Sequence, residues 1–130
     1  MLALVVARPG LVRDGLSALL SATPDIHQIV QVEEAAAAWE FVKTICPSLT
    51  IVHASPLTLD LIDFVEKEKN YCQCSQLLIV TNEADRKTAV SLNPDLVIME
   101  GTPSAKLATY ITTLLKQQSK GHSGQLKENN

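Results

Sequence analysis

Short apolar runs alternate five times with segments of helical periodicity along this chain. Most of these runs lack the polar alternation of a half-exposed strand, so they suit strands buried on both faces. The predicted strands are Leu2–Val6, Ile26–Val32, Leu49–Val52, Leu77–Val80 and Leu96–Met99. The predicted helices are Leu11–Ser21, Glu33–Ile45, Asp60–Lys69, Ala84–Leu92 and Ser104–Gln117. The alternation predicts an α/β fold: a (βα)5, doubly wound, five-stranded parallel sheet with right-handed crossovers.

The length and composition suit a single globular domain. The chain has 130 residues, of which 46% are hydrophobic and 19% are charged, enough to bury a continuous core. We expect one domain over residues 1–117. Residues 118–130 are polar and aperiodic, which predicts a tail or the beginning of a linker.

Charge and cysteine content limit the classes of function. The net charge is −3 and no run of Lys and Arg occurs, so nothing favours direct binding of nucleic acid. The apolar N-terminal stretch is too short to span a bilayer and lacks a basic leader, which predicts a cytoplasmic protein without membrane contact. The three cysteines are an odd number, and we expect reduced thiols.

In an open parallel sheet, ligands bind beyond the carboxyl ends of the strands, near the point where the strand order reverses. Functional side chains are therefore expected immediately after the predicted strands. The residues at these ends are Ala7, Arg8, His53, Ala54, Thr81, Asn82 and Glu100.

Several stretches carry a resemblance to a known family. Leu11-Val12-Arg13-Asp14-Gly15-Leu16 closely matches a motif that follows the first strand of response-regulator receiver domains, and 46–52, 78–82 and 98–103 match later segments. Over about residues 2–116 the chain resembles this CheY-like superfamily, above all the type with a C-terminal helix-turn-helix. The resemblance implies a flavodoxin-like sheet of strand order 2-1-3-4-5. It leaves open whether a DNA-binding domain follows residue 130.

The residues that give receivers their activity are largely replaced. Ala7 and Arg8 stand where the family has two acids that hold Mg²⁺, which requires hard oxygen ligands. His53 takes the place of the phosphoacceptor aspartate, and Glu100 that of the lysine that neutralises phosphoryl oxygens. The hydroxyl residue, Thr81, is retained. Val97 stands at the family's aromatic switch position.

Arg8 and Glu100 reverse the charge pattern of a receiver pocket. We hypothesise that they pair across it, with His53 between them, and hold the pocket in one state. The alternative is that both side chains point into water, where a pair would be worth only about 0–1 kcal/mol.

These features predict a pseudo-receiver: a phosphorylation-independent protein–protein interaction module in signal transduction or transcriptional regulation, with no enzymatic activity, metal or cofactor. Two alternatives remain open. The remodelled pocket could bind a small anionic metabolite through Arg8, or His53 could retain some phosphotransfer.

The expected partner is another regulator, a kinase, transcription machinery or a second copy of the chain. By resemblance, the preferred contact surface is the face formed by the fourth helix, fifth strand and fifth helix. Its candidate residues are Lys87, Val97, Leu107, Tyr110 and Leu114. For each of them the alternative is plain core packing.

Other polar and aromatic residues are better explained by structure than by function. Cys72-Gln73-Cys74 could bind a metal or form a strained disulfide, but no second ligand pair completes a zinc site, and ordinary loop thiols are expected. Cys46 is expected to pack. The run 66–69, Glu-Lys-Glu-Lys, and the acids Asp60 and Asp63 are expected to be solvated. Trp39 is expected to cover the sheet or to act as a surface anchor.

Overall fold

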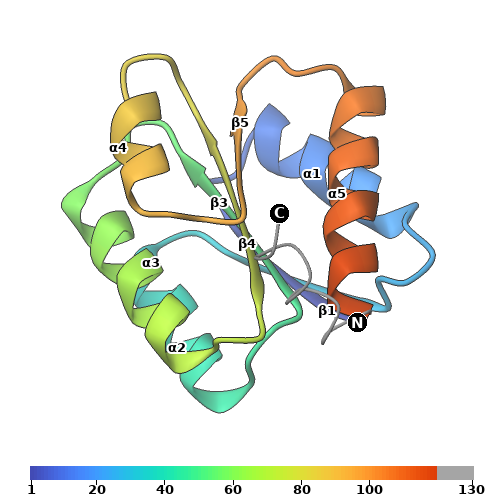
Figure 1. Cartoon of the computed structure of the whole chain (residues 1–130), viewed down its shortest axis with the longest axis horizontal. Helices are drawn as coiled ribbons and strands as arrows, with labels where there is room; N and C mark the ends of the chain where they lie inside the picture. Colours follow the sequence, from blue (N-terminus) through green and yellow to red (C-terminus); the bar gives the residue numbers. More distant parts are fainter. Residues whose placement is uncertain (120–130) are drawn as a thin grey trace, which may run out of the picture.

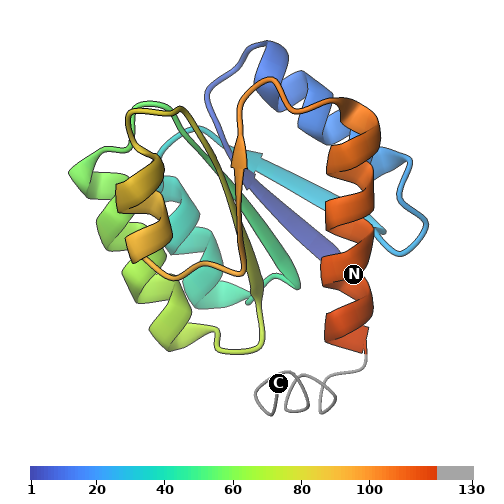
Figure 2. The ribbon, with the colours of Figure 1, turned by 45° about the horizontal axis from the view of Figure 1, so that its top comes forward.

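The computed structural model describes residues 1–119 as one five-stranded parallel sheet flanked by helices (Figures 1 and 2). The strands are β1 (Leu2–Val6), β2 (Gln28–Val32), β3 (Leu49–Ala54), β4 (Gln76–Thr81) and β5 (Leu96–Met99). The helices are α1 (Leu11–Ser21), α2 (Ala35–Thr44), α3 (Leu59–Tyr71), α4 (Arg86–Ser91) and α5 (Ser104–Ser119). The strand order is β2-β1-β3-β4-β5. The predicted fold class and strand order are confirmed.

The element boundaries differ from the prediction mainly where polar residues end an apolar run. β3 continues past Val52 to Ala54, because pairing with β4 extends to Ala54 opposite Thr81. His53 is therefore held within a strand. The second strand begins at Gln28 instead of Ile26, and the fifth helix extends to Ser119. Most of the predicted tail, residues 120–130, lies outside the described residues.

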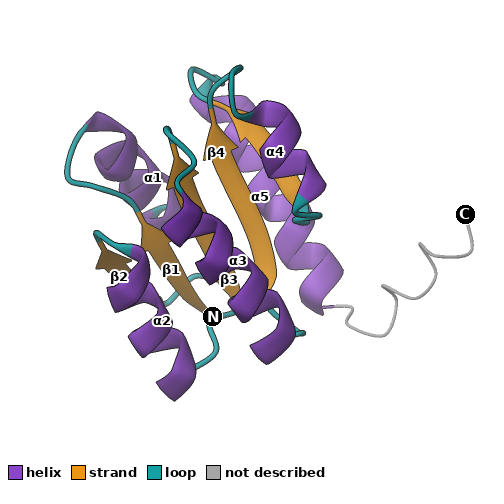
Figure 3. Cartoon of the chain, turned by 90° about the vertical axis from the view of Figure 1, so that its left-hand side faces the viewer, coloured by secondary structure: helices purple, strands orange, loops and turns teal. Residues whose placement is uncertain are grey.

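Helices cover the two faces of the sheet unequally (Figure 3). The core on one face is formed with α1 and α5, through residues such as Leu16, Leu20 and Ile111. The core on the other face is formed with α2, α3 and α4, including Val42 and Phe64. Successive β4 residues alternate between the two cores, as a strand buried on both faces requires.

The prediction of a solvated face at 66–69 was wrong for two of its four residues. Glu68 is buried, with 2% of its surface exposed, and accepts a hydrogen bond from the Thr50 hydroxyl of β3. The Lys69 Nζ donates to the Leu92 carbonyl oxygen at 2.9 Å and so secures the end of α4. Glu68 lies three and four residues after Val65 and Phe64, which places it on the buried stripe of α3.

The expectation of reduced thiols is also corrected for two of the three cysteines. Cys46 and Cys72 form a disulfide with a Cα–Cα distance of 5.7 Å. Cys46 follows α2 and Cys72 caps α3, so the packing of these two helices brings together residues 26 positions apart. Cys74 is exposed and lies outside the disulfide.

Within residues 1–119, no helix is both long enough and apolar enough to cross a membrane.

Burial raises the pKa of Glu68 from its ordinary value of 4.5 to about 7, although the Thr50 hydrogen bond opposes this shift. The folded state therefore binds this proton more tightly than the unfolded state. The resulting stability is fully present below pH 4.5 and is lost as the pH rises through about 7. Ionisation of Glu68 is therefore expected to lower the unfolding free energy of the wild-type chain by about 2–3 kcal/mol between pH 5 and pH 8. The variant Glu68→Gln, which cannot ionise, should lack this decrease.

Urea denaturation of both proteins at the two pH values measures this difference. The exposed neighbour Glu66 supplies the control, since Glu66→Gln should leave the pH profile unchanged. Equal pH profiles for wild type and Glu68→Gln would contradict the assignment.

Candidate functional site

The predicted site residues gather at the carboxyl edge of the sheet, where β1, β3, β4 and β5 end side by side. Parallel pairing aligns these strands, with Val6 opposite Val52 and Ala54 opposite Thr81. The strand order reverses between β1 and β3, because β2 lies on the far side of β1. This is the position at which open α/β sheets place their ligands.

The central contact of the site joins His53 of β3 to Glu100, the residue after β5. His53 Nε2 contacts Glu100 Oε2, with 18% and 35% of the two side chains exposed. The Ser55 hydroxyl donates to Glu100 Oε1 at 3.3 Å. The His53 contact requires a proton on Nε2, whether the ring is neutral or cationic. Glu100 therefore spans from the end of β5 to two residues at and beyond the end of β3.

Backbone hydrogen bonding at the end of β5 fixes the position of Glu100. The Glu100 N–H donates to the Thr81 carbonyl oxygen at 2.9 Å, which continues the β4–β5 pairing by one residue. Gly101 follows with φ of +86°, a conformation that glycine adopts without strain. The chain thus turns immediately after Glu100.

The hydroxyl group of Thr81, which stands at the position of the hydroxyl residue of receiver domains, already donates a hydrogen bond within the protein. Thr81 is fully buried, and its Oγ1 donates to the Ala54 carbonyl oxygen at 2.6 Å. A phosphoryl group at residue 53 would have to compete with that carbonyl for the proton.

Asn82 extends the network away from Glu100. Its Nδ2 donates to Ser55 Oγ at 2.8 Å, and its Oδ1 accepts from the Asp85 N–H at 2.9 Å. The Asp85 carboxylate in turn accepts from the Leu57 N–H at 3.0 Å. A continuous chain of hydrogen bonds therefore ties the loops after β3 and β4 to Glu100.

Ser55 and Asp85 were not among the residues singled out from the sequence. Ser55 directly follows β3, which was expected to end at Val52, and Asp85 lies in the loop after β4. Their role depends on how the two loops meet. The signal in the sequence was that polar residues follow closely after two apolar runs: Ser55 after the third strand, and Asn82 and Asp85 after the fourth.

Arg8 does not take the predicted place. Among the described residues no ion pair joins Arg8 to Glu100, whose side chain contacts His53 and Ser55 instead. Arg8 is exposed, because it begins the loop after Ala7, whose own N–H still donates to Val32 of β2 at 2.9 Å. The hypothesis of an Arg8–Glu100 pair was wrong, whereas its second part, a contact between Glu100 and His53, is observed.

A hollow of about 520 Å³ lies beside this contact and is lined by Arg8 and His53 among others. The other charged residues of the lining are Glu33, Glu34 and Asp60. Three carboxylates and one guanidinium group thus line the same hollow. This balance of charge opposes the binding of an anion through Arg8.

The residues present do not fit the magnesium ion that receivers use. Ala7 offers a buried methyl group and Arg8 a cation, whereas Mg²⁺ requires oxygen ligands in octahedral geometry. Within residues 1–119, no group of three or more His, Cys, Asp or Glu side chains is placed to hold a metal ion.

The candidate partner residues divide into two sets. Leu114 is 5% exposed and lies in the core, and Leu107 packs against the same core, so these two predictions are corrected: helix α5 turns this stripe inward. Lys87 is exposed, and 39% of Tyr110 is exposed. Tyr110 and Val97 line a second hollow of about 620 Å³, together with Val90, an exposed α4 residue missed in the sequence.

Comparison with known proteins bears on the fold. No protein-family model and no curated protein matches the chain. Solved structures do match. NtrX from Brucella abortus, solved in complex with ADP, has a TM-score of 0.79 at 17% identity over 95% of this chain and 29% of that one. This chain therefore spans less than a third of the NtrX chain.

Smaller proteins match along most of their length. A response-regulator receiver domain protein from Clostridium thermocellum has a TM-score of 0.76 at 13% identity, covering 91% of this chain and 96% of that chain. A two-component response regulator of the LuxR family from Aurantimonas sp. SI85-9A1 has a TM-score of 0.74 at 16% identity, covering 88% and 84%. The chain has the fold of response-regulator receiver domains.

Proposed function

We propose that this chain is a pseudo-receiver, a signalling module that works through contact with another protein and not through phosphoryl transfer. The observation that carries this proposal is the His53–Glu100 contact, which occupies the place where a receiver would be phosphorylated.

The proposal follows from what phosphoryl transfer to a receiver requires. An acceptor must be open to attack, a metal ion must bridge the phosphoryl oxygens, and a cation must neutralise the developing charge. Here the residue at the acceptor position contacts a carboxylate, and that carboxylate would repel a phosphoryl group. Ala7 cannot bind the metal ion.

The same residues argue against an enzymatic role. The His53–Glu100 pair has a histidine beside a carboxylate, and the neighbouring hydroxyl, that of Ser55, donates to Glu100 rather than to His53. Catalysis by a nucleophile–base arrangement needs the nucleophile to hydrogen-bond to the histidine. We therefore assign the site a conformational role, in which Glu100 joins the ends of β3 and β5.

The surface between α4, β5 and α5 is the proposed partner face. Exposed Val90 and Tyr110 flank the hollow that Val97 lines. Its rim carries charge of both signs, from Arg86, which pairs with Glu83 at 3.6 Å, and from Asp95. Lys87 of α4 is exposed outside this lining. An exposed aromatic side chain beside a hollow with a charged rim is typical of protein interfaces. A partner of this kind would be another regulator, a kinase, a component of the transcription machinery or a second copy of the chain.

Intact-mass measurement after incubation with acetyl phosphate and Mg²⁺ tests the absence of phosphoryl transfer. The wild-type chain is expected to keep its mass. As a positive control, the combined variant Ala7→Asp, Arg8→Asp, His53→Asp and Glu100→Lys restores the acids and the cation and should gain one phosphoryl group. A phosphorylated wild-type chain whose added mass disappears in His53→Asn would refute the proposal.

The partner face can be tested by quantitative pull-down from the native lysate, combined with sedimentation of the isolated chain. Tyr110→Ala is expected to weaken capture of a specific partner, or self-association, by about tenfold or more, the usual effect of losing an aromatic anchor. Leu11→Ala is the matched control, since Leu11 is 91% exposed but lies at the hollow beside Arg8. Loss of binding in Leu11→Ala but not in Tyr110→Ala would move the interface to the carboxyl edge.

A further inference from the structure

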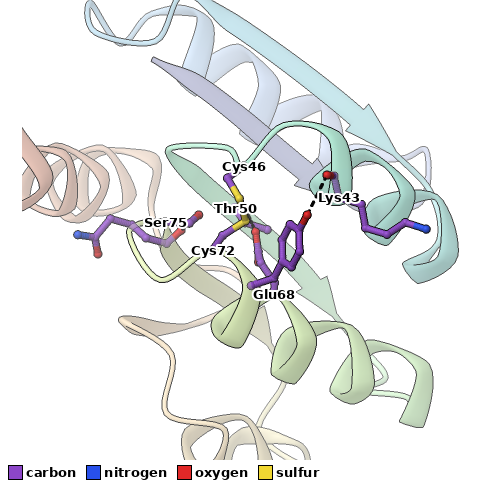
Figure 4. The surroundings of a disulfide bond; sticks show 8 residues. Lys43, Cys46, Thr50, Glu68, Cys72 and Ser75 are labelled. Atoms are coloured by element: carbon purple, nitrogen blue, oxygen red, sulfur yellow. Dashed lines mark hydrogen bonds between the residues drawn. A yellow bond between two sulfur atoms is a disulfide. The ribbon is translucent and has the colours of Figure 1, made fainter.

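The Cys46–Cys72 disulfide lies at the amino edge of the sheet, opposite the candidate site. Cys46 lies three residues before the start of β3, and Cys72 follows α3 and leads toward β4 (Figure 4). The disulfide therefore belongs to a region that the proposed function does not use.

The two half-cystines differ in their exposure. Cys46 is an exposed residue, whereas Cys72 is 5% exposed and packs with the core formed by α2, α3 and α4. Thiol–disulfide exchange requires that an incoming thiolate reach one of the two sulfur atoms. Because Cys46 is the exposed residue of the pair, its sulfur is the expected point of attack, and Cys72 would be the buried leaving group.

The last turn of α3 beneath the disulfide contains a poorly satisfied polar group. The Cys72 N–H donates to the Glu68 carbonyl oxygen at 2.7 Å, so both residues belong to the same turn. Glu68 Oε2 accepts from Thr50, but the buried Oε1 has no hydrogen-bond partner. Because an unsatisfied buried oxygen costs free energy that exposure to water would recover, this turn is less costly to open than an apolar one.

The only tryptophan lies on the same pair of helices. The Trp39 ring of α2 meets the Tyr71 ring of α3 edge-on at 5.5 Å, and Lys67 Nζ lies 5.5 Å from the Trp39 ring centre. The Tyr71 hydroxyl donates to the Lys43 carbonyl oxygen at 3.2 Å (Figure 4). Tyr71 directly precedes Cys72, so movement at the disulfide should reach Trp39.

We propose that Cys46 and Cys72 form a reversible thiol–disulfide exchange site whose substrate is a dithiol reductant, and that its oxidation state controls the packing of α2 against α3. This inference does not depend on the proposed function.

Reduction of the disulfide proceeds by two successive thiol–disulfide exchanges. One thiolate of the dithiol attacks Cys46 Sγ, the Cys46–Cys72 bond breaks, and Cys72 leaves as a thiolate that takes up a proton. The second thiol of the reductant then attacks the mixed disulfide and releases the Cys46 thiol. Two electrons and two protons have passed to the protein, and the reductant is left as a disulfide.

The test uses the full chain, equilibrated without denaturant in mixtures of reduced and oxidised dithiothreitol. Thiols are quenched with acid, labelled with a maleimide and counted by intact mass, while Trp39 fluorescence is followed in parallel. From the oxidised to the reduced end, the labelled thiols are expected to rise together from one, Cys74, to three. Fluorescence should change with the same midpoint, and the melting temperature should fall by roughly 10 °C on reduction.

Two variants separate exchange from general effects of the reductant. Cys74→Ser removes the exposed thiol outside the disulfide and should keep the same midpoint. Cys46→Ser removes the disulfide and should make both fluorescence and melting temperature independent of redox conditions. A redox response that persists in Cys46→Ser would overturn the proposal.

Two outcomes in the wild-type chain would also overturn it. One is that Cys46 and Cys72 stay reactive toward maleimide under fully oxidising conditions, so that no disulfide forms. The other is that the disulfide withstands excess dithiothreitol in the folded chain and opens only in denaturant, which would make it a purely structural cross-link.

Discussion

The parallel pairing of β3 with both β1 and β4 is the constraint on which the rest of this structure depends. Each parallel neighbour must be reached by a crossover, and the right-handed crossovers distribute the five helices over two faces. β3 is thereby buried on both sides, and its few polar residues must find partners within the protein. Thr50 finds Glu68 toward one edge of the sheet, and His53 finds Glu100 toward the other.

Only one of these two contacts, that of His53 with Glu100, lies where the fold places functional residues. The His53–Glu100 contact is the observation that supports the proposed pseudo-receiver role, since it places a carboxylate where the family resemblance expects a lysine. The pair is only partly shielded from water, so its effect concerns which arrangement of the loops is populated more than overall stability. The hydrogen bonds through Ser55, Asn82 and Asp85 extend this effect across two loops.

The Thr50–Glu68 contact lies away from the strand ends at which the family resemblance places functional residues. It lies in the layer where α3 packs on the sheet, one turn before the Cys46–Cys72 disulfide. The core at the amino edge contains a buried carboxyl group with an unpaired oxygen. It also contains the Cys46–Cys72 disulfide, of which Cys46 is an exposed residue. The two edges of β3 thus support two separate proposals, one for signalling without phosphoryl transfer and one for redox chemistry.

The sequence by itself determined the order and type of the elements, since the apolar runs and helical stripes report burial locally. It also determined which residues stand at the strand ends, because parallel strands align their carboxyl ends at one edge. It could not determine which of these residues touch: Glu100 contacts His53 and Ser55 rather than Arg8, because this depends on how the loops after β1, β3 and β5 are arranged in space. Likewise, Glu68 looked like part of a charged run, and only the rotation of α3 against β3 buried it. Cys46 and Cys72 met for the same reason, because the packing of two helices, and not spacing along the chain, decides which distant residues become neighbours.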